Sequence, residues 1–382
     1  MKMNKWTMGL AAAGIVSLSS VAQAQDAAAG AEALAASTSL TGYVSTGYKF
    51  NNGAANTGYF GAGGRNAFSM DVVDLKLSSA QGDGAQASGY TVELWFGGAD
   101  IGTGNSIGGG TWTDTNADGL VDAGEVSNVS PDSVQLMNAN IDLRMNGIDL
   151  KVGQFGTVVG NEVYNYNENA FYTHSWGFAI EPTHHVGVLG SYTVSDDLQI
   201  GLGLANTTGA RMAGSGVGSS KTFLATVSYT LPSGTGALAG TELYYGLVKG
   251  DADGASKGSD EYHYASIALP ELVANLGIKV VWDHVEYETQ VADSNVAGLY
   301  LDYALNADTT LNVRYEMGNI NTGLVGTFAD NADGLQSLTI GVNHKIWENV
   351  ISRIEYRNDT KDTTGSIDDA QSVVALNLIY SF

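Results

Sequence analysis

The chain has 382 residues, with 40 acidic and 17 basic side chains, 50 Gly, 4 Pro, 19 Tyr and no Cys. A formal net charge of −23 excludes nucleic acid as a partner, because its phosphates would be repelled. The absence of Cys excludes a disulfide scaffold and a Cys zinc site. Many Gly and few Pro favour numerous strands joined by turns, in two soluble domains or one large closed sheet.

Residues 1–24 have the form of a secretory signal peptide. Two lysines precede an apolar run over residues 8–21, and Ala22-Gln23-Ala24 supplies the small-residue cleavage pattern. A membrane anchor is the alternative, but the run is short, so we expect export and cleavage. Residues 25–38 are Ala-rich and predict a periplasmic tail, flexible or briefly helical, before a folded part over residues 39–382.

Hydrophobic residues alternate with a period of two along most of the folded part, as in half-buried strands. The pattern continues to the last residue of the chain, Phe382. Clear examples are Val73/Leu75/Leu77, Tyr90/Val92/Leu94/Phe96, Leu198/Ile200/Leu202/Leu204, Leu276/Ile278/Val280/Trp282, Leu311/Val313/Tyr315/Met317 and Val374/Leu376/Leu378/Tyr380.

Long polar connections alternate with short turns along the chain. Asn146-Gly147 is a two-residue hairpin signal, and similar brief turns occur near residues 195–197, 306–308 and 347–349. The alternation predicts an all-β fold, a transmembrane antiparallel β-barrel of about 16 strands with short periplasmic turns and long extracellular loops. Long connections are expected after the strands near 40–50, 89–97, 147–155, 198–206, 241–249, 274–287, 309–319 and 350–358.

A soluble β-sandwich is the alternative fold for so many alternating strands. A sandwich would show no systematic difference between its loops and would usually have fewer strands in a domain. The signal peptide, the even strand count and the terminal aromatic residue favour the barrel. Tyrosines near strand ends are then expected in interfacial girdles: Tyr43, Tyr90, Tyr229, Tyr264, Tyr287 and Tyr380.

One segment, residues 152–192, carries a family resemblance. Its elements are Gly153-Gln154-Phe155, Gly160 with Glu162, Asn169-Ala170-Phe171-Tyr172, and Pro182 two residues before His184. The segment resembles the signature of the putative beta-barrel porin-2 family of bacterial outer-membrane proteins. This resemblance implies a general porin.

The third outer loop, residues 156–183, is too long for a simple connector and is expected to fold inward as a pore constriction. Its acids would then face bases on the wall and create a transverse field across the passage. The alternative is that the loop covers the barrel rim and its charges are solvated. The predicted constriction residues are Glu162, Glu168 and Glu181 on the loop, and Lys76, Arg144 and Lys151 on the wall.

Further charged residues occupy the polar positions of the strand alternation. Such positions face a water-filled lumen, since charges on the lipid face would be costly. These residues are candidates for setting selectivity, and no single one stands out: Arg314, Arg353, Arg357, Glu93, Asp142, Asp149, Glu316 and Glu355.

The second outer loop, residues 98–131, contains DTNADGLVDAGE at residues 114–125, which matches an EF-hand calcium loop. The flanks break helices, so we expect a structural Ca²⁺ clamp of weak affinity, about 10⁻⁴ to 10⁻³ M. A soluble acidic loop that matches by chance is the alternative. The predicted ligands are Asp114, Asn116, Asp118, Leu120 through its carbonyl, Asp122 and Glu125.

No enzymatic motif emerges from the sequence. His184 and His185 are adjacent and would point to opposite faces of a strand, so we expect structural roles for them and for His174. The sequence has no Gly-x-Ser-x-Gly elbow and no phosphate loop. We therefore predict a protein that is not an enzyme.

The predicted function is passive diffusion of small hydrophilic solutes and ions across the bacterial outer membrane, with a preference for cations because of the acidic loops. A structural or adhesive surface barrel with calcium-stiffened loops and little conduction is the alternative. About sixteen strands leave an aqueous channel, which favours the pore. The expected partners are outer-membrane lipid and the permeating solutes. A homotrimer is a further expectation, by analogy with barrels of this size.

Overall fold

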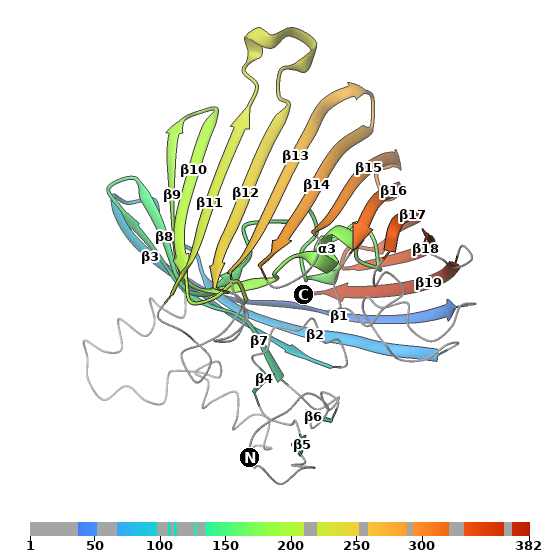
Figure 1. The fold of residues 1–382 in the computed structure, drawn as a ribbon. Helices are drawn as coiled ribbons and strands as arrows, with labels where there is room; N and C mark the ends of the chain where they lie inside the picture. Colours follow the sequence, from blue (N-terminus) through green and yellow to red (C-terminus); the bar gives the residue numbers. More distant parts are fainter. Residues whose placement is uncertain are drawn as a thin grey trace, which may run out of the picture.

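A computed structural model describes residues 37–51, 67–97, 106–107, 111–112, 126–127, 134–209, 220–251, 259–288, 293–320, 332–362 and 369–382. Sixteen of its strands form one closed antiparallel barrel, because β1 pairs with both β2 and β19 (Figure 1). The predicted all-β barrel is thus confirmed. Its strands are β1 (Thr38–Asn51), β2 (Ala67–Ser79), β3 (Gln86–Phe96), β7 (Val134–Met145), β8 (Ile148–Gly156), β9 (His184–Ser195), β10 (Leu198–Ala205), β11 (Thr222–Thr230), β12 (Glu242–Asp251), β13 (Ser259–Val273), β14 (Leu276–Tyr287), β15 (Ser294–Asn306), β16 (Thr309–Ile320), β17 (Ala332–Trp347), β18 (Val350–Asp362) and β19 (Asp369–Ser381).

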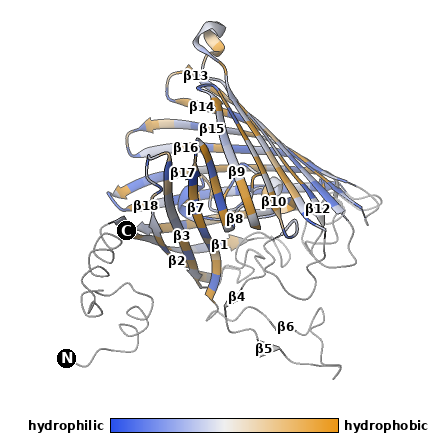
Figure 2. Cartoon of the chain, turned by 90° about the vertical axis from the view of Figure 1, so that its left-hand side faces the viewer, coloured by the Kyte–Doolittle hydropathy of each residue, from blue (hydrophilic) through white to orange (hydrophobic). Residues whose placement is uncertain are grey.

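Apolar residues cover the outside of the barrel, the reverse of a soluble sandwich. On β19, Val374, Leu376, Leu378 and Tyr380 are exposed, while the residues between them are buried inside. Orange and blue residues alternate along the strands in Figure 2. An apolar surface this extensive requires lipid around it, and each of the sixteen barrel strands is paired on both edges, as a membrane-spanning sheet must be.

The turn chemistry of the short connections agrees with the sequence. Asn146 and Gly147 have φ of 52° and 86°, as a type I′ turn between β7 and β8 requires. One of the connections predicted to be short, residues 231–241 between β11 and β12, is longer and contains the 3-10 turn η3 (Ser233–Leu238).

The predicted strand order is correct, but the difference between the two sets of connections is smaller than expected. Some strands extend further than the hydrophobic pattern, and the strand pairs β12–β13, β14–β15 and β18–β19 are separated only by residues 252–258, 288–293 and 363–368. The second outer loop includes three two-residue strands: β4 (Ser106–Ile107), which pairs with β7, and β5 (Thr111–Trp112) with β6 (Val126–Ser127). The predicted calcium loop, residues 114–125, and the predicted signal peptide, residues 1–24, lie outside the described residues.

The chain end takes part in closing the barrel. Phe382 exchanges two backbone hydrogen bonds with Gly42 on β1, at 2.9 and 3.0 Å. Only some of the tyrosines predicted for an interfacial girdle are on the outside. Tyr229 and Tyr380 are exposed, whereas Tyr43, Tyr264 and Tyr287 are buried. Those three alternate with outward residues and therefore face the lumen, where long side chains pack against other protein groups.

The segment between β8 and β9, residues 157–183, lies inside the barrel. It contains the 3-10 turn η2 (Tyr166–Glu168) and the short helix α3 (Trp176–Ile180), which Figure 1 shows within the curve of the sheet. Ser175 caps α3, since its hydroxyl accepts from the N–H of Phe178 at 3.0 Å. Among the described residues, no helix is long and apolar enough to cross a membrane.

Candidate functional site

Three arginines on the wall donate hydrogen bonds to backbone carbonyls of the 157–183 loop. Arg314 on β16 binds the carbonyl of Thr173 at 2.9 Å, and Arg357 on β18 binds that of His174 at 2.5 Å. Arg353, also on β18, reaches two further loop carbonyls at 2.6 Å each. The guanidinium groups supply the donors that an irregular buried backbone otherwise lacks.

Two wall glutamates satisfy loop N–H groups beside those arginines. Glu316 accepts from the N–H of Trp176 at 2.7 Å and of Gly177 at 3.2 Å, at the start of α3. Glu355 accepts from the N–H of Tyr172 at 2.6 Å. Wall side chains of both signs therefore bind the loop through its backbone.

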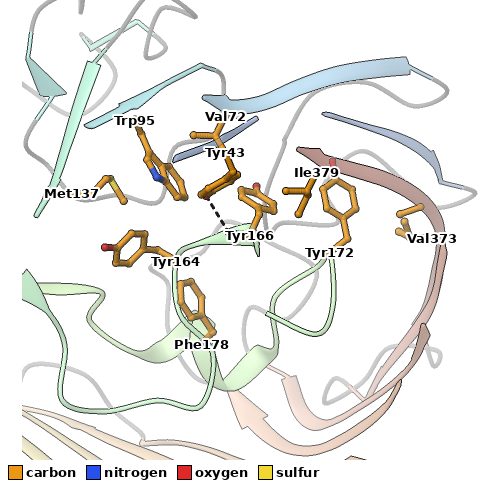
Figure 3. Close-up of a cluster of buried hydrophobic side chains, with 11 residues drawn as sticks. Tyr43, Val72, Trp95, Met137, Tyr164, Tyr166, Tyr172, Phe178, Val373 and Ile379 are labelled. Carbon is orange, nitrogen blue, oxygen red and sulfur yellow. Dashed lines mark hydrogen bonds between the residues drawn. The ribbon is translucent and has the colours of Figure 1, made fainter. Parts of the chain in front are cut away.

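A second side of the loop bonds to the strands near the N-terminus. The hydroxyl of Tyr43 on β1 accepts from the N–H of Tyr166 at 3.1 Å, the dashed line in Figure 3. Glu93 on β3 accepts from the hydroxyl of Tyr164 at 2.9 Å and from the amide of Asn165 at 3.0 Å. Aromatic side chains from loop and wall pack around these bonds: Tyr43, Trp95, Tyr164, Tyr166, Tyr172 and Phe178.

A third contact joins the beginning of the loop to β12. The hydroxyl of Tyr244 donates to the carbonyl of Val158 at 2.6 Å, and a Cβ at Gly246 would overlap the same carbonyl oxygen. Glycine is therefore required there, because the backbone of the loop approaches the wall directly. The loop thus contacts the wall from β1, β3, β12, β16 and β18.

The predicted loop acid Glu162 is buried against Arg314, with Oε1 2.6 Å from Nη1, and it also accepts from the N–H of Ser175 at 2.7 Å. Burial alone would raise its pKa. Arg314, His174 and the Ser175 N–H outweigh that effect and hold the pKa of Glu162 below its ordinary value. Glu162 is thus an ionised anchor of the loop.

The other two loop acids differ from Glu162. Burial and the neighbouring Asp283 on β14 raise the pKa of Glu181 well above its ordinary value, which favours its protonated form. Gly160 at φ 103° makes room for the Glu181 carboxyl, since a Cβ there would overlap it. Glu168 is exposed, and its carboxylate accepts from Asn165 at 3.0 Å.

The predicted wall bases lie on inward positions but pair with acids of the wall, not with the loop acids as predicted. Arg144 pairs with Asp149 at 2.7 Å, and Lys151 pairs with Asp142 at 2.9 Å, each across β7 and β8. Lys76 lies 3.9 Å from Glu93, which also accepts a hydrogen bond from Tyr164 of the loop. Each base pairs with the acid directly opposite it on the neighbouring strand, where side chains of opposite charge attract each other.

Three histidines lie within or beside the loop. Nε2 of His174 donates to the carbonyl of Val163 at 2.7 Å, and burial lowers the pKa of His174 from 6.5 to about 4. His184 packs its ring 4.5 Å from that of Tyr164, and His185 lies 2.9 Å from the hydroxyl of Thr157. All three are buried, and these contacts fit the structural roles expected for them.

Comparison with protein families agrees with both the sequence signature and the barrel geometry. The family model "Putative beta-barrel porin-2, OmpL-like" matches residues 37–382, which is nearly the whole chain. The chain belongs to the putative beta-barrel porin-2 family. The resemblance of residues 152–192 is thereby confirmed, and that segment is now seen to be the lumen loop with its flanking strands.

Solved porins share the fold of this beta-barrel porin-2 protein at low identity. The outer membrane channel DcaP of Acinetobacter baumannii has a TM-score of 0.58 at 12% identity, covering 90% of this chain and 97% of that chain. An anion-selective porin from Comamonas acidovorans scores 0.57 at 11%, covering 91% and 99%. The trimer form of OmpT from Vibrio cholerae scores 0.56 at 14%, covering 90% and 99%. A search of curated proteins gave no match.

The sequence predicted correctly that these charged side chains of the porin point inward, but it did not predict which groups most of them bind. Arg314, Arg353 and Arg357 are fully or almost fully buried and bind the loop, so they are not free to meet a solute. Among the charges predicted from the sequence, those that keep solvent contact are Lys76, Asp142, Arg144, Asp149 and Lys151 on the wall and Glu168 on the loop.

Proposed function

We propose that this porin lets small hydrophilic solutes diffuse passively across the outer membrane and that residues 157–183 narrow its passage. The carrying observation is the position of the loop, which lies in the lumen and bonds to wall strands on several sides. A loop held in this way limits the size of solute that can pass. A cover lying on the rim would not bind wall arginines through its backbone.

We further propose a preference for cations. The chain carries 40 acids against 17 bases, and the basic count falls to 15 if the predicted signal is removed with its two lysines. An acidic surface raises the local concentration of cations at the mouth of a pore. One structural neighbour is described as anion-selective, so the fold alone does not determine the sign of selectivity.

A planar bilayer with a potassium chloride gradient tests both parts. We expect stepwise openings and a reversal potential of the cation-selective sign. A reversal potential of anionic sign would remove the selectivity proposal and leave the pore. A folded barrel that never opens would favour the alternative, a structural or adhesive surface barrel, which the many contacts between loop and wall also permit.

We also propose that residues 114–125 bind Ca²⁺ as a structural clamp. The support is the ligand spacing in the sequence, with oxygen donors at Asp114, Asn116, Asp118, Asp122 and Glu125. Calcium at millimolar concentration should slow protease cutting within residues 98–131, and Asp118→Asn should abolish the protection. Equal cutting with and without calcium would count against the clamp.

A homotrimer is the oligomeric state that we propose. The support is analogy, since a solved OmpT neighbour of the same fold is described in a trimer form. Light scattering of the detergent-solubilised protein, corrected for bound detergent, should give about three times the mass of one chain. A single-chain mass would reject the trimer without affecting the pore.

A further inference from the structure

Three potential metal ligands meet on the outside of the barrel, at an end where β14 and β15 are joined by an outer connection. They are His284 and Glu286 on β14 and Asp293, which directly precedes β15. One ligand atom from each lies within 4.8 Å of the others. His284 and Glu286 alternate with the buried residues Asp283 and Val285, so both point away from the lumen.

Two carboxylates lie next to each other where the ladder between β14 and β15 ends, while Glu286 still pairs in register with Glu261 on β13. The last paired position of β14 and β15 is Val285 with Ser294. Glu286 and Asp293 are the next residues outward on either side, beyond the backbone hydrogen bonds of the hairpin. Like charges this close on neighbouring strands repel each other, and a cation bound between them would reduce the repulsion.

The hydrogen bonds of His284 supply a second, independent observation. Its Nδ1 lies 2.7 Å from the amide oxygen of Asn295, the residue opposite it in the strand register. An oxygen acceptor there requires Nδ1 to carry the proton, which leaves the lone pair of a neutral ring on Nε2. In that form Nε2 points its lone pair toward Oε1 of Glu286 at 3.3 Å, so the two atoms converge on one position.

We propose that His284, Glu286 and Asp293 bind a divalent cation of the zinc class on the outer surface of the barrel. One imidazole nitrogen and two carboxylates are a suitable ligand set for Zn²⁺, with a fourth position for water. The oxygen of Asn295 holds the ring of His284 as the outer partner of a metal-bound histidine does. The ion would join the ends of β14 and β15 across residues 288–293.

Zinc titration of the full-length, tag-free protein in detergent tests the proposal, with excess calcium present to occupy other acidic loops. Isothermal calorimetry should show one zinc ion for each chain. His284→Gln and Glu286→Gln should each weaken binding by at least about tenfold, by loss of a ligand. His344→Gln is the matched control, because His344 is an exposed strand histidine that bonds to Thr309 outside the cluster.

Two results would overturn the site: no zinc binding by the folded wild-type protein, or undiminished binding by His284→Gln. The first would mean that a proton on Nε2, in an ion pair with Glu286, takes the place of the metal. Heat-dependent gel mobility checks that each variant is a folded barrel. Asp293→Asn serves if a strand variant fails to fold, because Asp293 lies outside the strands.

Discussion

Arg314 on β16 contacts the 157–183 loop at several points. It is fully buried, pairs with Glu162 at 2.6 Å, donates to the carbonyl of Thr173, and lies over the ring of Phe171 at 4.7 Å. Its position on β16 is 152 residues from Glu162. Removing one partner of a buried ion pair leaves an uncompensated charge, which costs about 3–5 kcal/mol.

Arg314→Met should therefore release the loop from β16, and protease should cut residues 157–183 much faster than in the wild type. Arg144→Gln is the control, since its pair with Asp149 is partly exposed and such pairs contribute about 0–1 kcal/mol. Equal cutting of wild type and Arg314→Met would show that the ion pair does not hold the loop.

The sequence predicted the inward direction of these residues but not their partners. Alternation along a strand places Arg314, Glu316 and Glu93 on the lumen side, which is a local property of each strand. Pairing across the lumen depends on which strands the loop reaches, and no local pattern carries that information. The charge pairs of Arg144 and Lys151 could have been predicted, because the Asn146-Gly147 turn fixes the register of β7 against β8.

The docking of residues 157–183 depends on the space available beside β12 as well as on charge. Gly246→Ala should displace residues 157–159 from β12, because the added carbon overlaps the carbonyl of Val158. Overpacking of this kind costs about 1–3 kcal/mol. Thermal unfolding should show the loss, whereas Gly234→Ala should not, since open space surrounds Gly234. Equal melting temperatures for the two variants would contradict the direct approach of loop to wall.

The docking of the loop should also depend on pH. His174 has its pKa lowered to about 4, so its contribution is present above pH 6.5 and is lost as the pH falls through about 4. Glu162, with its lowered pKa, changes in the same direction. Glu181, with its raised pKa, favours docking at low pH and loses its contribution only as the pH rises through that raised value.

The contribution of Glu181 is complete below its ordinary pKa of 4.5, so hydrogen exchange of residues 157–183, corrected for the intrinsic effect of pH, should increase as the pH falls from 4.5 to about 3.5. The expected loss from His174 is about 3 kcal/mol, at about 1.4 kcal/mol for each unit of pKa. His174→Gln should move the increase to lower pH, where Glu162 alone is protonated. An unchanged transition in that variant would exclude His174 as its cause.

At the scale of the whole molecule, the barrel followed from the sequence more fully than the site did. Strand order and strand number follow from a period-two pattern along the barrel strands, and that pattern continues to Phe382. Loop lengths were overestimated where strands continue beyond their apolar residues, as at the ends of β12 and β18. The cluster of His284, Glu286 and Asp293 was not predicted from the sequence. Its residues come from the ends of two strands, and neither strand end contains a metal-binding motif by itself.

Because the chain has no Cys, an introduced cysteine is the single thiol that a thiol-specific reagent can label. In Glu168→Cys, a bulky thiol-specific reagent should reduce the single-channel conductance, because residue 168 is exposed on a loop inside the lumen. Thr235→Cys, exposed in the turn η3, should react equally well without changing the conductance. Unchanged conductance after complete labelling of residue 168, confirmed by mass, would contradict the account of residues 157–183 as the constriction of a pore.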